Sequence, residues 1–221
     1  MGGARALQRM SAAGAQKATL NWLQRFVVGL GLCPWARPQH TLVAVAPCHA
    51  GVEGGVRFMR RQAQLLALGT AGLYRGVEQP TCVCVFTDAS YADPVSFAGL
   101  WRTVEADLDA SLILLAFHPL RVDHGPGCLP QIASDAGHFS VRAPWPTLQL
   151  LRVADVLAAR EHWAEAHGGP GAFGLLTANK RKLRSTGTPR LQEMINTCRT
   201  DTALDSDITL VEDDVHVPRS I

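Results

Sequence analysis

The chain has 221 residues and a formal net charge of +2; 47% of its residues are hydrophobic and 18% are charged. This length suits one sizeable domain with its own core. No apolar run approaches the roughly 20 residues that span a bilayer, so the composition excludes a helical membrane protein and predicts a soluble globular one. Contact with a membrane complex remains open.

Charge is distributed unevenly along the chain. No Asp or Glu precedes Glu53, whereas acidic residues dominate after Arg199. An acid-free start rich in Ala, Gly and Arg is typical of a mitochondrial or plastid transit peptide, of which we favour the mitochondrial one, and blocks of one charge often contact partners. We therefore expect a basic extension over residues 1–16, a globular domain over 17–187, and a helix with an acidic tail over 188–221. The expected compartment is the mitochondrial matrix.

The first half of the chain predicts a helix, a strand and a second helix. Leu20, Leu23 and Leu30 follow helical spacing until Gly31 and Pro34 break it. The β-branched segment 41–47 predicts a strand that is closed by proline. After a glycine-rich turn, apolar residues from 56 to 66 recur at helical spacing and stop before residue 69.

The second half predicts further strands and helices. Continuous apolar runs at 81–87 and 111–117 are typical of buried strands, and between them Asp93 and Pro94 supply an N-cap and a first-turn proline. After irregular chain over 120–143, we expect a helix from Pro146 to about residue 168, another over 188–198, and an edge strand at 208–211. The order favours an α/β or α+β fold: a single layered domain whose central sheet has at least three strands (about 41–47, 81–87, 111–117) flanked by helices.

The loop after the third strand holds the candidate site residues. Ligands of open α/β sheets collect beyond the carboxyl ends of strands, which is where His118 lies. Arg142 and Arg152 could hold a carboxylate or phosphate, and Asp135 could orient the imidazole. The competing interpretation is a backbone-capping His-Pro turn with surface arginines. We expect the four side chains to surround a shallow pocket.

The cysteines predict reduced thiols and no metal site. They lie at positions 33, 48, 82, 84, 128 and 198, with no secretory signal and no pair of CxxC motifs. Cys82 and Cys84 should share one face of a strand as small buried residues. Cys33, in a helix-ending turn, is either a packed residue or a further site candidate. No cofactor is expected.

Several segments, in the same order, resemble a mostly bacterial family called domain of unknown function 1415. Its members typically carry "GLNLCPFA" near the start, "FHP" after a strand, and "NRSPYP" leading into "HLLRE". This chain has "GLGLCPWA" (29–36), "FHP" (117–119), "VRAPWP" (141–146), "QLLRV" (149–153) and a later "ANKRKLRSTG" (178–187). The resemblance covers roughly residues 17–187 and implies a scaffold and a site without naming a reaction.

The departures from the family's motifs fall on polar positions. Val141 and Ala143 stand where the family has Asn and Ser, and Gln149 and Val153 stand where it has His and Glu. Neither Val nor Ala can act as a general acid or base. Residues that shape the backbone or pack, such as Pro119, remain. We interpret residues 117–153 as an inherited site that has lost many of its polar side chains.

These observations favour a non-catalytic accessory subunit of a mitochondrial multiprotein complex, such as the respiratory chain or ATP synthase, with other subunits as partners. One alternative is an enzyme that acts on a small anionic metabolite through His118 and Arg142. A second is an RNA-contacting organellar ribosomal protein, suggested by the basic segment 179–190. That segment has no interleaved aromatic residues to stack on bases, which argues against nucleic acid as a partner.

Overall fold

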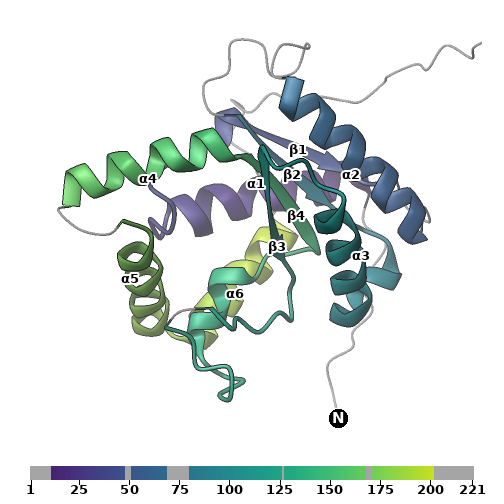
Figure 1. Ribbon diagram of the computed structural model, residues 1–221. Coiled ribbons are helices and arrows are strands. Elements are labelled where there is room, and N and C mark those ends of the chain that lie inside the picture. Colours follow the sequence, from purple (N-terminus) through teal and green to yellow (C-terminus); the bar gives the residue numbers. More distant parts are fainter. Residues whose placement is uncertain (1–10, 48–50, 69–79, 126, 168–170, 202–221) are drawn as a thin grey trace, which may run out of the picture.

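The computed structural model describes residues 11–47, 51–68, 80–125, 127–167 and 171–201 (Figure 1). The elements in chain order are α1 (Ala12–Asn21), η1 (Trp22–Val28), η2 (Pro38–His40), β1 (Thr41–Val45), α2 (Gly51–Leu68), β2 (Thr81–Val85), η4 (Ala89–Ala92), α3 (Pro94–Ala106), β3 (Leu112–Phe117), η5 (Ala136–Val141), β4 (Thr147–Arg152), α4 (Val153–His167), α5 (Gly171–Thr186) and α6 (Thr188–Thr200). The expected edge strand at 208–211, the acidic tail after residue 201 and residues 1–10 lie outside the described ranges. Within those ranges, no helix is long and apolar enough to cross a membrane.

The fold is a mixed α/β domain built on one four-stranded sheet in the order β1-β2-β4-β3. β1 and β2 pair in parallel, and β4 runs antiparallel to both of its neighbours, β2 and β3. β1, β2 and β3 therefore all point the same way. The three strands expected from the apolar runs are confirmed, each trimmed by one or two residues at an end.

The prediction of a helix from Pro146 was wrong for residues 147–152, which form the strand β4. Leu148 and Leu151 fit helical spacing, but Leu148 and Leu150 also alternate as a strand requires. Periodicity cannot distinguish the two over so short a run. Tertiary pairing favours the strand, because β4 forms hydrogen bonds with both β2 and β3. In this position Leu148 and Leu150 are completely buried. α4 then begins at Val153.

One face of the sheet is sealed by α2 and α3, which lie together on the same side in Figure 1. α3 begins as expected, because the Asp93 side chain accepts a hydrogen bond from the Ser96 N–H and Pro94 follows in the first turn. The core on this side comes from alternate strand residues and from apolar helix residues, among them Met59, Leu66, Cys82, Leu100, Leu148 and Leu150. This layer positions the sheet, and its strand residues are buried.

The opposite face is covered only over β1 and β2, where α1, η1 and α6 pack against it. α1 begins at Ala12, and Ala15 is completely buried, so residues 11–16 belong to the domain and not to the expected extension. Alanine and glycine allow this helix to approach the sheet closely. The helix expected from Thr188 is confirmed as α6, and its Leu191, Ile195 and Cys198 enter the same core.

Candidate functional site

His118 lies directly after β3, as the sequence predicts, but its ring is 2% exposed and fully engaged. Its Nδ1 accepts a hydrogen bond from the Leu120 N–H at 3.1 Å, and its Nε2 lies 3.1 Å from the Tyr91 carbonyl oxygen. These partners assign the proton to Nε2. Burial lowers the pKa of His118 below its ordinary value, although the hydrogen bond to Tyr91 opposes the shift. The histidine is therefore a neutral capping residue of the strand end.

Arg142 is brought next to the same strand end, because the His118 N–H donates to the Val141 carbonyl oxygen. Its Nε donates to the Arg121 carbonyl oxygen at 3.1 Å, and its guanidinium carbon lies 4.7 Å from the centroid of the Phe139 ring. Burial lowers the pKa of Arg142. Its hydrogen bond and ring contact both hold a loop in place.

Asp135 does not orient the imidazole. Its carboxylate caps η5 by accepting from the Gly137 N–H at 3.0 Å, and it forms a two-point ion pair with Arg184 of α5 at 2.7 and 2.8 Å. The hydrogen bond from Arg184 is the main reason that the pKa of Asp135 is lowered. The segment expected to be irregular thus contains a short 3-10 helix that is tied to α5.

A second ion pair involves the basic segment on α5 and was not predicted from the sequence. The Lys180 side chain is 2% exposed and its Nζ lies 3.1 Å from Asp123. Burial would raise the pKa of Asp123, but hydrogen bonds from the Gly125 N–H, Ser140 and Lys180 outweigh it and lower the pKa to about 2. Single-sequence patterns hold no signal for this pair, because its members lie far apart along the chain.

Arg152 lies far from His118. It pairs with Leu112 at the start of β3, whereas Phe117, just before His118, pairs with Thr147. Five strand residues correspond to roughly 16 Å. The Arg152 Nε instead binds Asp155 at 2.6 Å. The structure thus places the backbones of His118 and Arg142 next to each other, but not their functional groups. The His118 ring contacts Phe97 in one core layer, whereas the Arg142 guanidinium contacts Phe139 in the other. Arg152 and the Asp135–Arg184 pair make separate contacts.

A hollow of about 390 Å³ lies over the β3–β4 half of the sheet. Its floor is the β3–β4 part of the face opposite α2 and α3, including Leu115, Phe117, Gln149 and Leu151. Gln149 donates to the Thr81 hydroxyl at 3.0 Å, and that hydroxyl donates to the Leu150 carbonyl oxygen at 3.1 Å. Gln149 is the position where the family's motif has histidine.

The walls of this hollow, which we call the sheet cavity, come from four distant segments. η1 contributes Trp22 and Phe26, the loop before β1 contributes Cys33 and Trp35, and α4 and α5 close the other side. η1 is a π-helix, a form that often occurs at functional sites. A Cβ at Gly29, directly after η1, would lie 2.3 Å from a backbone oxygen, so only glycine fits there.

The loop and the helices meet around the cavity. The Trp35 ring contacts Trp163 of α4 edge to face at a centroid distance of 5.8 Å, and Asn179 of α5 hydrogen-bonds to the Leu32 carbonyl oxygen. Four of the five segments that carry the resemblance to the family contribute lining residues, namely 29–36, 117–119, 149–153 and 178–187, whereas segment 141–146 does not. The sheet cavity is therefore the better candidate site, and of the predicted residues it contains only Cys33.

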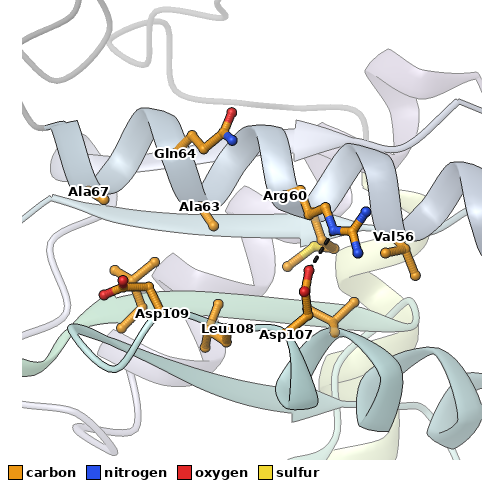
Figure 2. A pocket seen from close by; sticks show the side chains of 11 residues that line it. Val56, Arg60, Ala63, Gln64, Ala67, Asp107, Leu108 and Asp109 are labelled. Carbon is orange, nitrogen blue, oxygen red and sulfur yellow. Dashed lines mark hydrogen bonds and ion pairs between the residues drawn. The ribbon is translucent and has the colours of Figure 1, made fainter.

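A second hollow of about 320 Å³ lies between α2 and α3 (Figure 2). Figure 2 shows Arg60 reaching from α2 to Asp107 at the end of α3, with which it forms an ion pair. Asp109 accepts a hydrogen bond from the Ser111 N–H at 2.8 Å. Apolar residues make up most of the remaining lining, so this groove offers a binding partner few polar groups.

The described ranges contain no group of three or more His, Cys, Asp or Glu residues that could hold a metal ion. Cys82 and Cys84 share one face of β2, as expected, with their sulfur atoms 3.6 Å apart and both side chains buried. Burial raises the pKa of Cys84. These thiols lie in the sealed core, far from solvent.

A family model described as "Protein of unknown function (DUF1415)" matches residues 14–192. The match includes all four strands and every segment that lines the sheet cavity. No curated protein and no solved structure shows significant similarity to the chain.

Proposed function

Because the chain belongs to the DUF1415 family of proteins of unknown function, its role must be argued from its own geometry, and we propose a non-catalytic accessory subunit of a mitochondrial multiprotein complex. The single observation that carries this proposal is that His118, Asp135 and Arg142 use their polar atoms within the fold. A general acid or base has to reach a proton of its substrate. His118, at 2% exposure and with both ring nitrogens engaged, does not reach one.

The alternative enzyme, which uses His118 and Arg142 on a small anion, receives less support. The backbones of the two residues are neighbours, but Arg142 is held by the Arg121 carbonyl and by the Phe139 ring. The His118 ring packs on Phe97 instead. Neither residue lines the sheet cavity, which is the larger hollow. Gln149 takes the floor position where the family's motif has a titratable histidine.

The RNA-contacting alternative is weakened by the ion pairs of the basic segment. Lys180 pairs with Asp123, Arg184 with Asp135 and Arg190 with Glu193. Cations that are already neutralised by carboxylates release few counterions on meeting a phosphate backbone. The basic segment thus serves the fold.

The compartment and the assembly are proposed from charge alone. Arg25, Arg37 and Lys17 lie in a stretch that has no acidic residue before Glu53, and acidic residues gather after residue 201. Regions of opposite charge favour docking on complementary partners, and the respiratory chain or ATP synthase are the assemblies we propose.

Native gel electrophoresis of extracts from cells that make the protein tests the accessory role. We expect the tagged full chain to migrate with an assembly several times larger than its own 23.8 kDa, and to co-purify with its subunits. A free monomer would contradict the accessory role. A reporter fused to residues 1–40 tests the compartment separately, and its retention in the cytosol would remove the mitochondrion without removing the accessory role.

A further inference from the structure

We propose that the sheet cavity binds a small amphipathic anion, with an apolar body against the open half of the sheet and a single anionic head at Arg37 and Arg160. This inference goes beyond the accessory role, because it assigns a ligand class to a specific site. It rests on the cavity's volume, on its apolar floor and on the two arginines that line it.

Shape and lining indicate a small molecule. The volume of about 390 Å³ falls within the ordinary range of ligand pockets, roughly 300–1,000 Å³. The sheet, η1, the loop before β1 and the α4–α5 pair surround this space. The Leu115 side chain on the floor remains 39% exposed and Leu176 on α5 is also exposed, so large apolar side chains are left uncovered.

The lining of the cavity is mostly apolar and carries a small number of polar groups. Gln149 contributes a carboxamide to the floor, and its NH₂ group is already bound to Thr81. Few polar groups on an apolar lining are typical of a ligand site.

The edge of the cavity is positive. Arg37 and Arg160 line it, and among the described lining residues the one carboxylate, Asp155, is paired with Arg152. Arg37 donates to the carbonyl oxygens of Pro34 and Ala36, and within the described ranges neither Arg37 nor Arg160 forms an ion pair. Guanidinium groups bind carboxylate and phosphate heads strongly, whereas they repel a cation. Charge therefore selects an anion.

Titration calorimetry on the full-length protein tests the proposal with three probes that share one ten-carbon tail: decanoate, decyl phosphate and decyltrimethylammonium. We expect saturable binding of one anionic probe per chain, and at least tenfold weaker binding of the cationic probe. Decanoate and decyl phosphate both satisfy the proposal, and the tighter of the two identifies the head group. Equal binding of all three probes, or no saturable binding, would overturn it.

Two variants locate the ligand. Arg37→Gln combined with Arg160→Gln removes both charges while keeping long polar side chains, and we expect about a tenfold loss of decanoate affinity. Ala159→Phe places a ring in the cavity and should abolish binding of both anionic probes. The matched control is Arg57→Gln, because Arg57 is an exposed arginine on α2, at the opposite face of the sheet. Arg57→Gln should bind decanoate like the unchanged protein.

Thermal unfolding shows that each variant is folded before its binding is compared. If Ala159→Phe unfolds, Leu115→Gln is a second variant that disrupts the apolar floor of the cavity. It should be tolerated by the fold because Leu115 is partly exposed. Unchanged decanoate affinity in a folded Ala159→Phe or Leu115→Gln variant would mean that the probe binds elsewhere. A dimer on a sizing column whose stability does not respond to decanoate would assign the cavity to a second copy of the chain and reject the proposal.

Discussion

The two faces of the sheet differ in how completely they are covered. Over the first, α2 and α3 lie directly on the strands, and side chains such as Cys82 and Leu150 are completely buried. Over the second, α1 and α6 cover β1 and β2, while α4 and α5 stand off from β3 and β4 and leave the sheet cavity. The first face supplies stability, and the second combines stability with a binding site.

The two faces are also held together by different forces. The sealed face depends on apolar packing. The walls around the cavity combine apolar packing with polar contacts. Phe26 of η1 and Leu183 of α5 are buried in the core on this side. α5 is held in addition by Asp123 with Lys180, by Asp135 with Arg184, and by Asn179 with the loop before β1. The contrast can be tested on each face.

The largest effect is expected at the buried ion pair of the cavity wall. Asp123→Asn leaves Lys180 in a buried site without its carboxylate, and removal of one partner from such a pair costs about 3–5 kcal/mol of unfolding free energy. Urea unfolding measures it. The double variant Asp123→Asn with Lys180→Met removes both charges and should recover much of the loss. If the double variant is as unstable as the single one, the charge is not the cause.

The Asp123 carboxylate also makes the free energy of unfolding depend on pH in acid. Its folded pKa of about 2 lies below the ordinary value of 3.8, so the unfolded chain takes up the proton first. The stabilisation is complete above about pH 4 and is lost as the pH falls toward 2. The difference of nearly two pKa units corresponds to about 2 kcal/mol, and Asp123→Asn should lack this part of the acid dependence.

A matched pair of leucines on neighbouring strands compares the faces directly. Leu150→Ala in the sealed core should cost about 3 kcal/mol, since truncation of a buried leucine loses packing and leaves a cavity. Leu115→Ala, on the cavity floor at 39% exposure, should cost less than about 1 kcal/mol because surface-facing changes have small effects. Urea unfolding of both variants measures the difference. Equal losses would show that the second face is sealed in solution.

The smallest effect concerns His118, at the end of β3. Burial lowers its folded pKa, with Tyr91 and Asp93 opposing the shift and Arg121 assisting it. The unfolded chain therefore binds a proton first, so stability is full above the ordinary pKa of about 6.5 and declines as the pH falls below it. His118→Asn should flatten the decline of unfolding free energy between about pH 7 and pH 5. An unchanged slope would assign the decline to other groups.

Local sequence signals were enough for the scaffold. Asp93 and Pro94 start α3, Thr188 starts α6, and continuous apolar runs mark β1, β2 and β3, because caps and strand burial act on neighbouring residues. Motifs quoted from residues 29 to 187 also identified the family that the model match shows. These features depend on residues close together in the chain.

Tertiary structure decided the rest. Residues 147–152 form a strand because they pair with both β2 and β3, which lie far away along the chain. The local sequence pattern does not show that these two strands have a free position between them. His118 was placed correctly at a strand end, yet its burial depends on Tyr91 and Leu120. The sheet cavity collects residues from Trp22 to Asn179, and its existence follows from helices that stop short of the sheet. Such features arise from long-range packing, which one sequence read locally does not encode in any visible pattern.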